Sequence, residues 1–145
     1  MRIISRSEEE SLKIGEAIGR SLKGGEVICL LGDLGAGKTT LVKGIAKGMG
    51  IFQGYQVRSP TFTLVNQYPT EKGTLIHVDL CRTREDIDLS EFVGKGVLVI
   101  EWAEGLELCQ CTIRIEFFQE GRILEFLGCE DLLKALSMTK AVEIL

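Results

Sequence analysis

The chain carries one motif with a clear chemical purpose. Residues 32–39 read GDLGAGKT and match the phosphate-loop (Walker A) pattern GxxxxGK[ST]. A triphosphate needs several converging backbone N–H donors, and the three glycines of this motif lack the Cβ atoms that would block their approach. Lys38 would bridge the β and γ phosphates, and the Thr39 hydroxyl would take a coordination position on Mg²⁺. The motif therefore predicts a nucleotide site.

A magnesium ion also needs carboxylate support. Asp79 and Glu101 stand at the ends of two apolar stretches, residues 74–80 (TLIHVDL) and 97–102 (VLVIEW). Ligands of open α/β sheets bind at the carboxyl ends of the strands, so either carboxylate could lie near the phosphate loop. The spacing does not choose between Asp79 and Glu101 as the direct metal ligand.

The motif lies between a predicted strand and a predicted helix. Residues 26–31 (EVICLL) form a short apolar run that is typical of a buried strand, and residues 38–49 have helical spacing. An earlier helix is expected over residues 7–22, with Ser7 as its N-cap. The remaining expected elements are a loop leading into a strand over residues 57–68, ended by Pro69, strands over 74–80 and 97–102, a hairpin of 112–118 with 122–127, and a helix over 131–138.

These elements favour an α/β fold. We expect a single P-loop NTPase-like domain over residues 1–145, with a mixed, partly parallel sheet flanked by helices and an antiparallel C-terminal hairpin. The length of 145 residues suits one domain, and a hydrophobic content of 45% suits a self-sufficient core. No apolar run approaches the roughly 20 residues that span a bilayer, which excludes a membrane protein.

The net charge bears on whether the chain binds nucleic acid by itself. With a net charge of −4, the chain lacks the excess of basic residues found in proteins that bind nucleic acid unaided, so contact with RNA would need a partner.

Glycine accounts for 17 of the 145 residues, and nine of these fall within residues 24–54. Beyond the phosphate loop, Gly24 and Gly25 suit a turn, and Gly44, Gly48 and Gly50 suit close packing or helix termination.

The five cysteines are an odd number without a paired framework, and no signal peptide precedes them. They favour a reducing, cytoplasmic location with buried or strand-borne thiols. A zinc site at Cys109 and Cys111 is disfavoured, because no second pair exists and the chain has one histidine. The cysteines are Cys29, Cys81, Cys109, Cys111 and Cys129.

With its loop written GDLGAGKTTLVKG, the chain resembles the TsaE family, formerly YjeE. Three further stretches carry the resemblance: residues 59–65 (SPTFTLV), residues 77–82 (HVDLCR, against HxDLYR) and residues 100–104 (IEWAE, against IEWxE). The four motifs follow the family order, and the resemblance covers most of the chain, roughly residues 7–128. Two positions depart from the family pattern, since Cys81 replaces a tyrosine and Ala103 replaces the commoner proline.

The resemblance implies a bacterial P-loop ATPase needed for threonylcarbamoyladenosine formation in tRNA. Such a protein would use Mg²⁺ and turn ATP into ADP while bound to TsaB and TsaD. TsaD would transfer the threonylcarbamoyl group, so this chain would meet tRNA only through the complex.

The resemblance also implies roles for individual residues. The catalytic residues would be Lys38, Asp79 and Glu101. The metal would involve Thr39, Glu101 and Asp79. A switch-like loop would contain Ser59 and Thr61. The nucleotide-binding set would be Ser11, Gly32, Leu34, Gly35, Ala36, Gly37, Lys38, Thr39, Thr40 and Trp102.

Simpler interpretations stay open beside these roles. His77 is interpreted as a structural strand residue, Trp102 could be packing alone, and Ser59 and Thr61 could be turn residues around Pro60. No residue is an evident arginine finger, which predicts slow hydrolysis by the isolated chain. The alternatives to an ATPase are a small-metabolite kinase and a non-hydrolytic, nucleotide-dependent scaffold.

Overall fold

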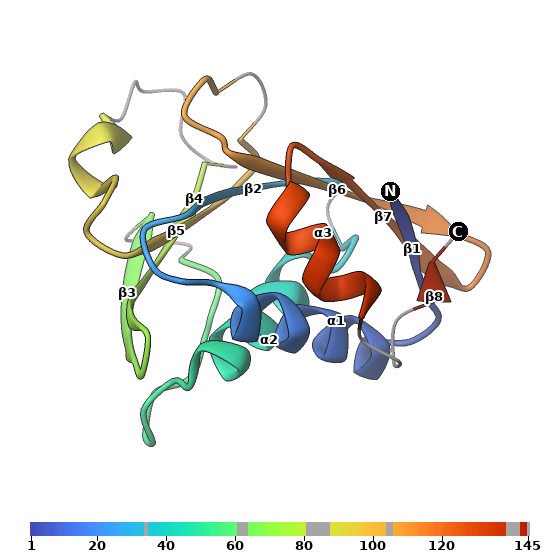
Figure 1. Ribbon diagram of the computed structural model, residues 1–145, viewed down its shortest axis with the longest axis horizontal. Coiled ribbons are helices and arrows are strands. Elements are labelled where there is room, and N and C mark those ends of the chain that lie inside the picture. The colour runs from blue at the N-terminus through green and yellow to red at the C-terminus, as the bar shows by residue number, and fades with distance from the viewer. Residues whose placement is uncertain (34, 61–63, 81–87, 104–105, 139–142, 145) are drawn as a thin grey trace.

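The computed structural model describes residues 1–33, 35–60, 64–80, 88–103, 106–138 and 143–144. Within these residues eight strands form one sheet in the order β3-β4-β5-β2-β6-β7-β1-β8 (Figure 1). The elements are β1 (Arg2–Ser5), α1 (Glu8–Ser21), β2 (Val27–Leu31), α2 (Lys38–Met49), β3 (Val65–Thr70), β4 (Gly73–Asp79), the 3₁₀ helix η1 (Leu89–Phe92), β5 (Val97–Glu101), β6 (Cys111–Phe118), β7 (Gly121–Leu127), α3 (Glu130–Ser137) and β8 (Glu143–Ile144). This mixed sheet with flanking helices confirms the predicted fold class.

The centre of the sheet is parallel and its margins are antiparallel. Strands β4, β5, β2 and β6 run in one direction, so their carboxyl ends lie at one edge of the sheet. At that edge Asp79 of β4 is the register partner of Glu101 of β5, and Leu30 of β2 is the partner of Glu101 on the other side. The two predicted carboxylates therefore end neighbouring strands beside the start of the phosphate loop.

The two faces of the sheet are covered differently. The three α-helices lie on one face, and the alternate residues Ile28 and Leu30 of β2 pack into their core (Figure 1). Val27 and Cys29 point to the opposite face, where η1 and residues 106–109 form a smaller core. None of the helices in the described ranges is long and apolar enough to cross a membrane.

Helices α1 and α2 pack with their backbones in direct contact through two glycines on each helix. A Cβ atom at Gly15 would lie 2.9 Å from the Cα of Gly44, and one at Gly19 would lie 2.9 Å from the Cα of Gly48. Close packing, one of the two expected explanations, is confirmed for Gly44 and Gly48. Because this contact leaves no room for side chains, it sets the distance between the two helices that border the site.

Most predicted boundaries are confirmed within one or two residues. The Ser7 hydroxyl caps α1 by accepting from the Glu10 N–H at 3.1 Å, and α2 spans the predicted residues. The expectation that Pro69 ends its strand is wrong, since β3 runs through it to Thr70. β3 lies at the edge of the sheet, where a residue without an N–H costs no ladder bond. The short outer strands β1 and β8 were not predicted.

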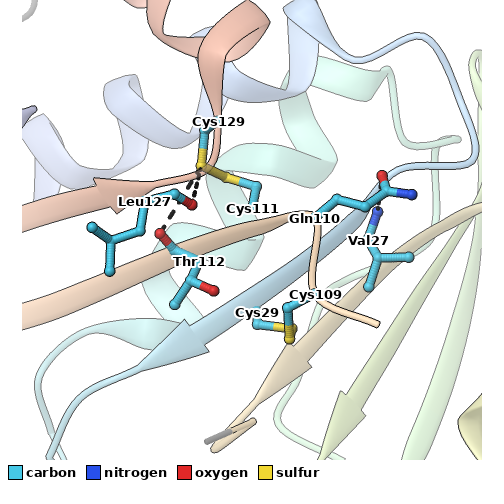
Figure 2. Close-up of a disulfide and its surroundings, with 8 residues drawn as sticks. All are labelled: Val27, Cys29, Cys109, Gln110, Cys111, Thr112, Leu127 and Cys129. Carbon is cyan, nitrogen blue, oxygen red and sulfur yellow. Dashed lines mark hydrogen bonds between the residues drawn. A yellow bond between two sulfur atoms is a disulfide. The ribbon is translucent and has the colours of Figure 1, made fainter. Parts of the chain in front are cut away.

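The expectation of free thiols is wrong for four of the five cysteines. Disulfides join Cys29 to Cys109 and Cys111 to Cys129 (Figure 2). The residue between the two bridges, Gln110, pairs with Val27, which brings the residues before β6 against β2. Because Cys109 and Cys111 belong to different bridges, they do not share a zinc ion. Cys81 lies outside the described residues.

Candidate nucleotide-binding site

The phosphate loop joins the end of β2 to the start of α2, as the motif predicts. Gly37 is the N-cap of α2 with φ 105°, and a Cβ atom there would meet nothing within 4 Å. The left-handed backbone, rather than crowding, therefore requires glycine at this position. The Ala36 N–H donates to the Asp33 carbonyl at 3.0 Å and closes a turn inside the loop. Leu34 lies outside the described residues.

The loop lysine is buried between the loop backbone and an aromatic ring. Lys38 Nζ donates to the Gly32 carbonyl at 2.7 Å and to the Asp33 carbonyl at 3.0 Å. The centroid of the Trp102 ring lies 3.9 Å from Nζ, a distance at which the ring face attracts a cation. Trp102 directly follows β5 and has φ 65°, a costly conformation for a bulky residue. This turn brings the only tryptophan of the chain to the loop lysine.

A buried set of polar groups extends from the start of α2 into the sheet. Thr39 Oγ1 lies 3.4 Å and 3.5 Å from the two carboxylate oxygens of Glu101. His77 Nε2 lies 2.5 Å from Glu101 Oε2, and the His77 ring is fully buried. Side chains alternate along a strand, so His77 and Asp79 of β4 and Glu101 of β5 all project to the face that α2 covers.

Asp79 has a different partner from Glu101. Its carboxylate accepts a hydrogen bond from Ser59 Oγ at 3.1 Å, and its N–H donates to the Leu64 carbonyl at 2.9 Å. Asp79 thus contacts Ser59 in the predicted switch-like loop, residues 58–63, and Leu64 directly after it, whereas Glu101 contacts Thr39. Thr61, the other predicted residue of that loop, lies outside the described residues.

A pocket of about 320 Å³ adjoins the phosphate loop on its other side. The first turn of α1 supplies one wall, the loop and Thr40 supply the floor, and the turn between β6 and β7 supplies the second wall. Ser11 lines the pocket and is buried, with its hydroxyl 2.6 Å from that of Ser5. Arg122 also lines it, and sequence reasoning did not single out this residue. No local pattern marks Arg122, because 85 residues separate it from Gly37 and only the sheet brings the two together.

The donor set fits a magnesium ion shared with phosphate. Mg²⁺ prefers hard oxygen ligands and is usually held by one or two protein side chains together with substrate phosphates. A hydroxyl and a carboxylate provide such oxygens at Thr39 and Glu101. Among the described residues, no three His, Cys, Asp or Glu side chains group closely enough to hold a metal by themselves. A magnesium site in which phosphate oxygens complete the coordination agrees with the pairing of Thr39 and Glu101 and with the small number of protein ligands.

A strand, a glycine-rich phosphate loop and a helix on a partly parallel sheet define a P-loop NTPase-like domain. The family model described as "Threonylcarbamoyl adenosine biosynthesis protein TsaE" matches residues 5–124. The chain therefore belongs to the TsaE family of proteins of tRNA threonylcarbamoyladenosine biosynthesis, as its four motifs predict.

Individual relatives support this assignment over most of the chain. The tRNA threonylcarbamoyladenosine biosynthesis protein TsaE of Aquifex aeolicus is 52% identical over 120 residues, which cover 83% of this chain and 90% of that protein. The TsaE protein of Treponema pallidum is 43% identical over 123 residues, covering 79% and 89%. The crystal structure of Bacillus subtilis YdiB superposes with a TM-score of 0.76 at 33% identity, covering 92% of this chain and 94% of YdiB.

Proposed function

We propose that the chain is a Mg²⁺-dependent ATPase that supports tRNA threonylcarbamoyladenosine formation in complex with TsaB and TsaD, without performing the transfer itself. One observation carries the proposal. The hydroxyl of Thr39, next to the loop lysine, lies 3.4 Å from the buried carboxylate of Glu101. The phosphate-loop motif and the carboxylate that we assign to the metal thus meet at the start of α2.

The phosphate loop and α2 provide the phosphate site. Backbone N–H groups at the start of α2 favour negative charge, and the helix dipole adds to this effect. Lys38 would exchange its loop carbonyls for the β and γ phosphates. The nucleoside would occupy the pocket beside Ser11 and Thr40, and Trp102 would border the site at Lys38.

The carboxylates would hold the metal and order the attacking water. Thr39 and Glu101 would ligate Mg²⁺, and Asp79 would hold its water shell from the neighbouring strand. When bound, Mg²⁺ neutralises charge on the β and γ phosphate oxygens. The protein itself positions the phosphates and the water, which is the main contribution required of it in this reaction.

The partners would complete the site. Ser59 links the start of the switch-like loop to Asp79, and we assign Ser59 and Thr61 to a switch that responds to the γ-phosphate. Arg122, which lines the pocket, already donates to loop carbonyls, and we assign no arginine finger among the residues that the structure describes. We therefore expect slow hydrolysis by the isolated chain and faster hydrolysis with TsaB and TsaD.

A cytoplasmic location is part of the proposal, because the complex with TsaB and TsaD would act on tRNA there. The cysteines no longer support that location, since disulfides are rare in a reducing cytoplasm. The proposed location rests on the family assignment instead.

Release of labelled phosphate from [γ-³²P]ATP tests the proposal. We expect Mg²⁺-dependent release that is lost in Lys38→Ala and kept in Lys47→Ala, an exposed lysine at the other end of α2. Transfer of the label to a metabolite would instead favour a kinase. Unchanged tRNA modification and assembly with Lys38→Ala would favour a non-hydrolytic scaffold.

A further inference from the structure

Arg122, the second residue of β7, reaches across the pocket to the backbone of the phosphate loop. Its Nε donates to the Ala36 carbonyl at 2.9 Å, and Nη2 lies 3.4 Å from the Gly35 carbonyl. Nη1 donates to the carbonyl of Gly121 at 2.9 Å, in its own strand. One guanidinium group therefore ties two consecutive loop carbonyls to the sheet.

An aromatic ring holds this guanidinium in place. Phe117 of β6 is the register partner of Arg122, and its ring centroid lies 4.3 Å from the guanidinium carbon. Phe117 is 54% exposed, so burial alone does not account for an aromatic residue at this position. The cation–π contact adds a restraint on the guanidinium besides its three hydrogen bonds.

The bonds to the loop carbonyls have a consequence for the phosphate side of the loop. In a planar trans peptide, the C=O of one residue and the N–H of the next point in opposite directions. Holding the Ala36 carbonyl toward Arg122 therefore turns the Gly37 N–H away from it. A loop with three glycines has many backbone conformations available, so an outside restraint is needed to keep these amides in one arrangement.

We propose that Arg122 is the positioning residue of the phosphate loop, holding the loop amides in the arrangement that binds the nucleotide phosphates. The proposal rests on the proposed nucleotide-binding function. Arg122 acts through the loop backbone and needs no contact with phosphate. A lysine would not reproduce this contact, because Arg122 bonds the carbonyls of Ala36, Gly35 and Gly121 through three separate nitrogens of one rigid plane, whereas the donors of an ammonium all lie on a single atom.

The test compares Arg122→Gln and Arg122→Lys with the control Arg2→Gln. Arg2 lies on β1 in the same sheet and pairs with Glu125 away from the pocket. The first readout is NMR hydrogen exchange of the Ala36 N–H in protein without nucleotide, because this amide bonds the Asp33 carbonyl inside the loop. The second readout is the Kd of MgADP, together with KM and kcat for ATP.

Both Arg122 variants should raise the Ala36 exchange rate and the MgADP Kd by about tenfold, the loss expected for a charge-assisted hydrogen bond. KM should rise while kcat stays within about threefold, and Arg2→Gln should change neither readout. Full rescue by Arg122→Lys would overturn the positioning role in favour of a charge effect. Unchanged exchange and Kd in Arg122→Gln would also overturn it.

The role of Arg122 and the proposed function can fail independently of each other in this test. If wild-type protein fails to bind MgADP, the proposed function fails, while the exchange readout still decides whether Arg122 holds the loop. If Arg122→Gln does not fold, Phe117→Leu provides the second variant, since it weakens the restraint on the guanidinium without removing it. We expect a twofold to threefold rise in both readouts for Phe117→Leu, and no rise would count against the proposal.

Discussion

His77 Nε2 lies 2.5 Å from a carboxylate oxygen of Glu101, and both side chains are buried in the sheet beneath α2. His77 therefore has a definite structural role: its ring fixes the orientation of the Glu101 carboxylate, which faces Thr39. The Nδ1 atom of His77 has no hydrogen-bond partner among the described residues. Glu101 is therefore the contact that accounts for a polar ring at this place.

Removing His77 should cost stability because the buried carboxylate of Glu101 would lose its nearest partner and, among the described residues, keep only the longer contacts to Thr39. We expect His77→Leu to lower the free energy of unfolding by about 1–3 kcal/mol, the cost of an unsatisfied buried group. The double variant His77→Leu/Glu101→Met should cost less than the sum of the two single variants. Urea denaturation measures all three, and strict additivity would show that the two groups do not interact.

Glu101 and Asp79 should differ in their effect on the metal. Because Glu101 lies beside Thr39 and Asp79 bonds Ser59, Glu101→Gln should raise the Mg²⁺ concentration for half-maximal ATP hydrolysis by about tenfold or more. Asp79→Asn should raise it less and should lower kcat through the switch-like loop. Magnesium titrations of phosphate release compare the two variants, and a larger effect of Asp79→Asn would reverse the assignment.

Alanine at Gly48 should destabilise the chain although alanine favours helices. By helix propensity alone, Gly48→Ala would stabilise α2 by roughly 1 kcal/mol. A Cβ atom there would lie 2.1 Å from the carbonyl oxygen of Glu16, so we expect a net loss of about 2–3 kcal/mol from overpacking. Gly25→Ala is the control, since its Cβ meets nothing within 4 Å and only its φ of 86° is unfavourable. Thermal denaturation should show the larger loss for Gly48→Ala.

Reduction should destabilise the protein through its two disulfides. The bridges span 80 and 18 residues, and closing loops of this size stabilises a fold by roughly 2–4 kcal/mol each. Urea denaturation with and without dithiothreitol measures the loss, and Cys111→Ser isolates the contribution of the shorter bridge. Alkylation of the unreduced, denatured protein followed by mass spectrometry should leave Cys29, Cys109, Cys111 and Cys129 unmodified. Labelling of these four would show thiols instead.

Local sequence patterns predicted most of the fold, because helical and strand periodicity is visible within one element. Strand β8 has two residues, too few for a periodic signal, and β1 has four. The extension of β3 through Pro69 depends on its edge position, which only the assembled sheet reveals. The same limit applies to the Cys29–Cys109 bridge, whose two cysteines lie 80 residues apart.

The candidate site likewise has one part that local sequence predicts and another that depends on the assembled sheet. The phosphate loop is a continuous motif, so its residues and its place between strand and helix were predicted from local spacing. The approach of Glu101 to Thr39 spans 62 residues and depends on strand order. Arg122 was missed because its partners are backbone carbonyls 86 and 87 residues away, and backbone partners leave no mark in a sequence.

The proposed ATPase activity is decided by phosphate release from MgATP, measured for the wild-type chain and for Lys38→Ala with TsaB and TsaD present. We expect the wild type to release phosphate in a Mg²⁺-dependent reaction that is faster than without the partners, and Lys38→Ala to release at least about a hundredfold less. Equal release by the two chains, or none from the wild type in the complex, would contradict the proposed activity.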